Sequence, residues 1–141
     1  MEITNYVSYE LAVKLKACGF DEPCIAQWAC EPNGKPILVG STAFVFSNAE
    51  LKGRDVTAPL LFHAQKWLRE KWGIHVDACV FSDYSTDADG KVCDRWDFWG
   101  FDLYAVVGGE KIIDDDGEYD SYEQALSEGI KSALELIKEG E

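Results

Sequence analysis

The sequence predicts an α+β fold, a two-layer sandwich in which helices cover one face of a mainly antiparallel sheet. Two observations predict it: apolar residues recur at helical spacing in three segments, and the segments between them carry alternating patterns and Gly-containing turns typical of β-hairpins. The expected order is α-β-β-α-β-β-(β)-α, and hairpins joined by helices favour antiparallel pairing. With 141 residues, 47% of them hydrophobic, the chain is expected to form one globular domain spanning residues 1–141.

The first helix is predicted over residues 9–18, with Ser8 as its N-cap and Gly19 as its stop. Strands at 24–30 and 37–46 follow, and the Asn33-Gly34 pair between them predicts a type I′ hairpin turn. Prolines on both sides of that pair cannot donate to a β-ladder, which suggests a loop longer than two residues.

The central helix is predicted over residues 58–72, the segment around which the other elements are arranged. Thr57 is its expected N-cap, Pro59 suits the first turn, and Gly73 can adopt the left-handed conformation that ends a helix. Its core-facing stripe spans about 140° of arc and comprises Leu60, Leu61, Ala64, Trp67, Leu68 and Trp72.

A hairpin, a short strand and a last helix complete the chain. Strands are predicted at 74–82 and 94–107, with a turn at Asp89-Gly90, then a short strand at 110–114 and an acidic loop. Ser121 and Gln124 form a capping box at the start of the last helix, whose apolar arc includes Gly129.

Cysteine usage and the N-terminus indicate a cytoplasmic protein without a cofactor. The five cysteines are an odd set and contain no C-x-x-C pair, so reduced, buried thiols are expected rather than disulfides or a zinc ribbon. The N-terminus lacks the pattern of a signal peptide, and no apolar run approaches the roughly 20 residues that cross a bilayer.

The net charge of −13 is concentrated in one region of the sequence. Residues 82–120 contain twelve acidic and three basic residues, whereas residues 1–81 are close to neutral. Such a field repels phosphate backbones and anionic lipids, so direct binding of nucleic acid or membrane is not expected.

Two acidic segments are candidates for a divalent cation. Asp87 and Asp89 match oxygen-ligand positions of an EF-hand loop, but Trp96 stands where that loop needs its bidentate glutamate, and a hairpin turn is the favoured interpretation. Asp114 and Asp116 belong to a run that could gather an ion or simply form a solvated loop.

No motif for catalysis stands out, and no catalytic residue is assigned. The chain contains no nucleophile elbow, zinc-protease helix or phosphate-binding loop. His75 and Cys79 share a strand face but lie about 13 Å apart along it, which is too far for a direct nucleophile–base pair.

The aromatic strand at 94–107 is the candidate partner-binding element. Its apolar anchors alternate with carboxylates, a mixture that suits a basic protein partner, although core packing would explain the same rings. The candidate contact residues are Trp96, Phe98, Trp99 and Phe101, with Asp97 and Asp102 as the acidic rim.

Several short motifs also carry a resemblance. The chain contains S-Y-E near both ends and G-F-D-E-P after the first helix. It also contains A-x-x-W-L-R-E-K-x-G-I-H from Ala64 to His75 and D-S-Y-E-Q-A-L-S-x-G-I from Asp120 to Ile130. In these the chain resembles a family of short α+β proteins from gut anaerobic bacteria and their phages or prophages, a family with no established activity. The resemblance implies a phage or mobile-element accessory protein rather than a metabolic enzyme.

The sequence therefore favours a non-enzymatic, cytoplasmic interaction module with an acidic surface and a basic protein partner. Two alternatives stay open: a DNA mimic that inhibits a DNA-binding protein, and a small divalent-metal-binding protein or enzyme. Mimicry requires carboxylates in two strand-like rows, so their arrangement in space decides its merit.

Overall fold

The computed structural model describes residues 3–40 and 44–140, with Asp116 described by its backbone alone. The α-helices are α1 (Tyr9–Ala17), α2 (Leu61–Trp67) and α3 (Tyr122–Glu139). The strands are β1 (Ala26–Cys30), β2 (Pro36–Gly40), β3 (Val56–Thr57), β4 (Ile74–Thr86), β5 (Val92–Ala105) and β6 (Lys111–Tyr119). Short helical turns, η1 (Ile3–Asn5), η2 (Asn48–Glu50) and η3 (Leu68–Trp72), complete the described elements.

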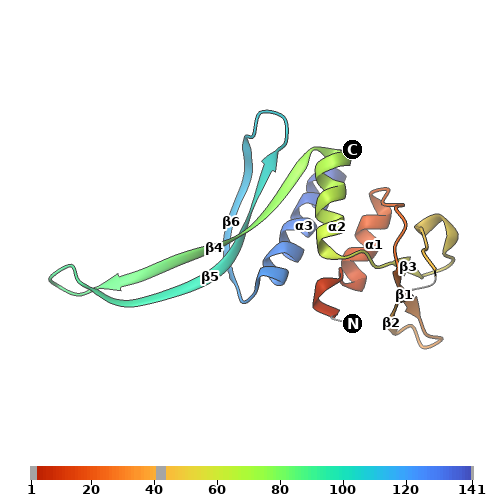
Figure 1. The fold of residues 1–141 in the computed structure, drawn as a ribbon, viewed down its shortest axis with the longest axis horizontal. Helices are drawn as coiled ribbons and strands as arrows, with labels where there is room; N and C mark the ends of the chain where they lie inside the picture. Colours follow the sequence, from red (N-terminus) through yellow and green to blue (C-terminus); the bar gives the residue numbers. More distant parts are fainter. Residues whose placement is uncertain (1–2, 41–43, 141) are drawn as a thin grey trace.

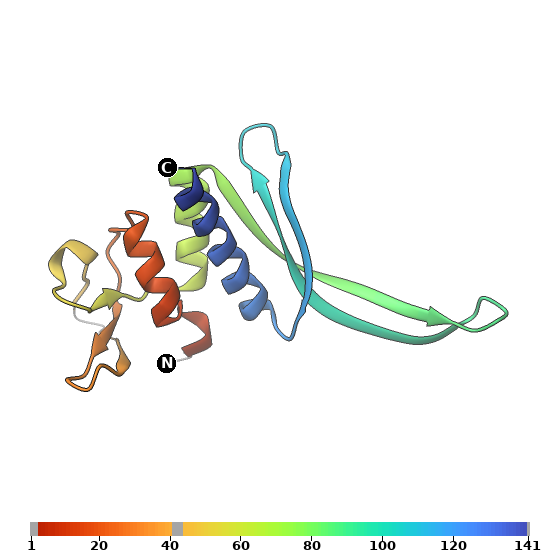
Figure 2. The same cartoon turned by 180° about the vertical axis from the view of Figure 1, so that it is seen from behind.

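The predicted α+β class and antiparallel pairing are confirmed, and the element order agrees apart from the added β3. The strands form two sheets, β2-β1-β3 and β4-β5-β6, instead of one. The three α-helices lie between these sheets (Figures 1 and 2). One face of the β4-β5-β6 sheet packs on α2 and α3, and no helix in the described part of the chain covers the other face.

The first helix and first hairpin form largely where the sequence predicts them. Ser8 caps α1 by accepting a hydrogen bond from the Leu11 amide at 3.2 Å. In the hairpin, Gly34 has a φ of 88°, but Asn33 does not adopt a positive φ, so the predicted type I′ turn is wrong and a longer loop connects β1 and β2, as the flanking prolines suggest. The predicted strand at 37–46 ends earlier, and its residues 41–43 lie outside the described part of the chain.

The central helix begins later than predicted. Thr57 is not its N-cap, because Thr57 belongs to β3 and its amide donates to Asn48 Oδ1 at 2.9 Å. Leu60 takes the N-cap position without a side-chain hydrogen bond, and the last turn, η3, widens to a π-helix. The predicted stop at Gly73 is confirmed by its left-handed φ of 68°.

The acidic segment after residue 113 is a strand rather than the predicted loop. Asp114 and Asp115 pair with Asp102 and Phe101 of β5, so β6 continues to Tyr119. The backbone groups at the free edge of β5 attract a partner strand, and the charged side chains of β6 protect the new edge from further pairing.

The core joins the helices to both sheets. Ser121 caps α3, and the buried residues of that helix pack over Val76, Phe101 and Leu103 of the second sheet. Val7, Leu15 and Phe20 extend the same cluster toward the first sheet. Among the described residues no helix has both the length and the apolar character needed to cross a bilayer.

Candidate interaction surface and polar cluster

The feature that dominates the shape of the molecule is a long two-stranded arm. The ladder between β4 and β5 continues from Ile74↔Ala105 to Thr86↔Val92, whereas β6 pairs with β5 only between Trp99 and Tyr104. Residues 81–98 therefore extend beyond the third strand, and Figures 1 and 2 show them projecting far from the helices. We call residues 81–98 the hairpin arm.

The arm leaves large apolar side chains in contact with water. Tyr84 is 60% exposed, Val92 55% and Trp96 46%. Phe81 and Phe98 pair across the strands, with ring centroids 5.8 Å apart in a stacked arrangement, and they close the base of the arm. A two-stranded ribbon without a covering layer is only marginally stable in water. A partner surface that buries these side chains would therefore stabilise the arm.

The arm also carries charge of one predominant sign. All five of its acidic residues are exposed, against two basic residues, which gives it a net charge of −3. Arg95 Nε lies 3.6 Å from Asp97 Oδ1, and its Nη2 donates to Ser82 Oγ at 3.2 Å. The carboxylates lie on both faces and at the tip with cations between them, which is not the pair of regular rows that a DNA duplex presents.

The residues predicted for partner binding lie in different environments. Trp96 and Asp97 are exposed on opposite faces of the arm, and Phe98 is half-buried at its base. Trp99 packs edge-to-face on Tyr122 of α3, at 5.6 Å between centroids.

The other two predicted contact residues are not available to a partner. Phe101 is 2% exposed because it faces α3, where it forms part of the core. Asp102 is 5% exposed and belongs to a separate polar cluster described below.

The residues predicted for a divalent cation are not brought together. Asp87 Oδ1 accepts hydrogen bonds from the amides of Asp89 and Lys91, at 2.9 and 3.0 Å, so it stabilises the turn at the tip of the arm. Asp114 pairs with Asp102 near the other end of the sheet, about 30 Å away at roughly 3.3 Å per residue. The side chain of Asp116 lies outside the described residues.

A polar cluster occupies the uncovered face of the second sheet, and its composition was not anticipated from the sequence. Asp77 and Cys79 of β4 lie beside Asp102 of β5, and their ligand atoms are all within 4.8 Å of one another. The Cys79 sulfur is 3.4 Å from Asp77 Oδ2 and 3.6 Å from Asp102 Oδ2. Tyr104 donates to Asp102 Oδ2 at 3.3 Å. The alternation of β4 places Asp77 and Cys79 on one face, but only the cross-strand register brings Asp102 to them.

Among the described residues, the acidic side chains of the cluster have one nearby cation, Lys111. Lys111 Nζ lies 3.7 Å from Asp102 Oδ2 and 3.8 Å from Asp114 Oδ2. Burial, followed by the two neighbouring carboxylates, raises the pKa of the Cys79 thiol to about 12. The thiol is therefore protonated and a poor nucleophile at neutral pH, which gives no support to covalent catalysis by Cys79.

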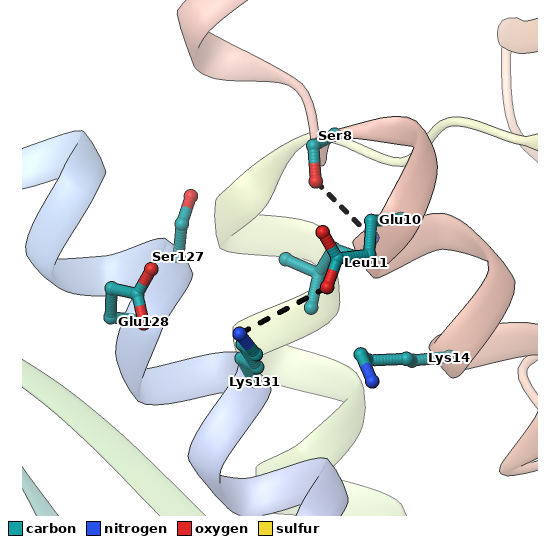
Figure 3. Close-up of a pocket in the computed structure, with 7 residues that line it drawn as sticks. All are labelled: Ser8, Glu10, Leu11, Lys14, Ser127, Glu128 and Lys131. Carbon is teal, nitrogen blue, oxygen red and sulfur yellow. Dashed lines mark hydrogen bonds and ion pairs between the residues drawn. The ribbon is translucent and has the colours of Figure 1, made fainter. Parts of the chain in front are cut away.

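One of the pockets lined by polar side chains lies between α1 and α3 (Figure 3). Its volume is about 80 Å³, and it is lined by Ser8, Glu10, Leu11, Lys14, Ser127, Glu128 and Lys131. Lys131 Nζ lies 3.9 Å from Glu10 Oε1 across it, and the Ser8 hydroxyl is engaged in capping α1. This pocket is smaller than the roughly 300–1,000 Å³ of typical small-molecule sites.

Comparison of the chain with protein-family models, curated proteins and solved structures found no match.

Proposed function

We propose that this protein is a non-enzymatic interaction module, an accessory protein of a phage or mobile element, whose hairpin arm docks onto a basic protein. The observation that carries the proposal is the arm itself, an extended acidic ribbon with exposed aromatic side chains.

The chemistry of the arm favours a protein partner. Tyr and Trp are the residue types that most often dominate the binding energy of protein interfaces, and Tyr84 and Trp96 are exposed on opposite faces of the ribbon. Carboxylates around such anchors accelerate association with a positively charged surface and weaken binding to acidic ones. The same carboxylates disfavour nucleic acid, and their arrangement does not favour DNA mimicry.

The unpaired edges of the arm add a second mode of contact. Beyond the end of β6, the outer edges of β4 and β5 present backbone groups that no neighbouring strand of the described chain engages. A partner that adds a strand there would form main-chain hydrogen bonds while covering the exposed rings.

Binding variants with a matched control test this proposal. The tagged chain is used to capture proteins from host extract, and the captured protein is purified and titrated against wild type, Trp96→Ala and Phe62→Ala. Phe62 is the control because it is a large aromatic residue, 63% exposed, on α2 away from the arm. We expect a basic partner whose affinity falls at least about 30-fold for Trp96→Ala, the loss typical of an interface hot spot, and changes less than threefold for Phe62→Ala.

Two results would contradict the proposal. One is a specific partner that binds Trp96→Ala as tightly as wild type. The other is a partner whose affinity does not fall as salt is raised from low to physiological concentration, because salt screens the attraction between an acidic surface and a basic partner.

A further inference from the structure

The polar cluster on the uncovered face of the second sheet contains an unsatisfied buried charge. Asp102 is 5% exposed, and its Oδ1 is buried without a hydrogen-bond partner among the described residues. The other oxygen, Oδ2, accepts a hydrogen bond from the Tyr104 hydroxyl, lies within hydrogen-bonding distance of the Cys79 sulfur and forms an ion pair with the Lys111 ammonium. A buried carboxylate oxygen without a partner destabilises the folded protein, so this atom requires a further donor or a cation.

The thiol cannot satisfy both neighbouring carboxylates. Cys79 has a single S–H proton, yet its sulfur lies within hydrogen-bonding distance of Asp77 Oδ2 and of Asp102 Oδ2. Whichever oxygen accepts the proton, the other faces a sulfur lone pair. A cation placed among the three atoms would interact favourably with all of them.

We propose that Asp77, Cys79 and Asp102 form a binding site for a divalent transition-metal ion of the zinc type. Bonds of about 2.3 Å to sulfur and about 2.1 Å to oxygen place the two ligand atoms about 3.6 Å apart around a tetrahedral ion. The sulfur–oxygen distances of 3.4 Å to Asp77 Oδ2 and 3.6 Å to Asp102 Oδ2 are close to that separation. The unsatisfied Oδ1 belongs to the same Asp102 carboxylate, which can turn either oxygen, or both, toward the ion.

The donor set selects the class of ion. One thiolate with two carboxylates suits zinc or cobalt, whereas magnesium and calcium prefer sites made only of oxygen. The three side chains supply three ligands, and water completes the tetrahedron. His75, two residues before Asp77 on the same face, has a buried Nδ1 without a partner but lies outside the group whose ligand atoms converge.

Charge balance supports a bound ion. With a protonated thiol, the two carboxylates and Lys111 give the cluster a net charge of −1. When a divalent ion binds, the Cys79 proton passes to the buffer, and the thiolate, two carboxylates, Lys111 and the ion sum to zero. The ion would replace the Lys111 ammonium as the cation beside Asp102, and Lys111 would keep its ion pair with Asp114.

Titration of the purified, reduced full-length chain with Co²⁺ tests the site. We expect one equivalent to produce the near-ultraviolet absorption of a thiolate–cobalt bond, and one equivalent of Zn²⁺ to remove it, whereas excess Mg²⁺ or Ca²⁺ leaves it unchanged. Cys79→Ser should lose the band, and Cys93→Ser, which changes an exposed cysteine on the arm, should keep it.

The carboxylates are tested separately by Zn²⁺ calorimetry. Asp77→Asn and Asp102→Asn should each lower the affinity at least about tenfold, because each removes one anionic ligand. Asp77 is only half-buried, so its variant remains informative if Asp102→Asn fails to fold. Absence of a thiolate–cobalt band, its persistence in Cys79→Ser, or unchanged Zn²⁺ affinity in folded Asp77→Asn would overturn the proposal.

Discussion

Replacement of Gly129 by alanine gives a demanding test of the packing between α3 and the second sheet. In an ordinary helix interior this change stabilises a protein by roughly 1 kcal/mol, because alanine has the higher helix propensity. Here a Cβ at position 129 would lie 2.5 Å from Val76 Cγ1 and 3.1 Å from Phe101 Cγ. The buried helix face meets the sheet at a distance that only glycine allows.

The expected magnitude follows from these contacts. Carbon atoms pack at about 3.5–4.0 Å, so the new methyl group must displace the Val76 methyl by about 1 Å. Val76 is fully buried, and its β-branched side chain is restricted at χ1, so it accommodates such a displacement poorly. Overpacking of this kind costs about 1–3 kcal/mol. After the helix-propensity gain is subtracted, we expect Gly129→Ala to lower the free energy of unfolding by about 1 kcal/mol.

A double-mutant cycle measured by urea denaturation isolates the steric term. Val76→Ala alone creates a cavity and destabilises the protein by about 2 kcal/mol. Because it also removes the Cγ1 methyl, adding Gly129→Ala to that variant should cost less than in wild type, with a coupling free energy of about 1–2 kcal/mol. Stabilisation of the wild-type protein by Gly129→Ala, or strict additivity in the cycle, would contradict the steric clash between a Cβ at position 129 and Val76.

Three further predictions concern buried and exposed polar groups. Burial raises the pKa of the Cys24 thiol to about 11, so the folded state retains a proton that the unfolded chain loses above about pH 8.5. The free energy of unfolding should therefore fall by roughly 1.4 kcal/mol per pH unit as the pH rises toward 11. In urea titrations at alkaline pH, Cys24→Ala should reduce this slope. Asn48, which is 6% exposed, bonds two backbone groups through its side chain, and Asn48→Ala should destabilise by about 2–4 kcal/mol; a loss below 1 kcal/mol would contradict the bonding shown. In thiol labelling at pH 8 followed by peptide mapping, Cys93 should react before Cys79, because Cys93 is exposed and the Cys79 thiol is held protonated; the reverse order would be inconsistent with this cluster.

The local signals in the sequence determined most of the elements. Ser8 and Ser121 cap α1 and α3 as their spacing to the first turn predicts, and Gly73 ends the central helical segment in the left-handed conformation. These features depend on contacts between neighbours in the chain, which a sequence displays directly. Thr57 differs from the predicted N-cap because its amide donates to Asn48, nine residues earlier, and a helix pattern does not display such a partner.

The candidate sites depended on contacts that the sequence does not display. The acidity of residues 82–120 and the aromatic character of the strand beyond Asp94 were evident from the sequence, and both features are found in the hairpin arm and the sheet at its base. Which rings are exposed could not be read from them, because alternation identifies two faces without saying which one a helix covers. Phe101 lies on the face that α3 covers, whereas Trp96 lies on the arm, where side chains of both faces are exposed.

The sequence by itself determined α1 and α3, the end of the central helical segment, the positions of the hairpin turns, the alternation of the strands and the region of excess negative charge, because each of these arises from residues within a few positions of one another. The tertiary structure decided that the strands divide into two sheets, that β6 ends where the arm begins, and that Asp102 lies against Asp77 and Cys79. Strand register and sheet membership are set by packing between distant segments, and a shift of one residue would send Asp102 to the opposite face.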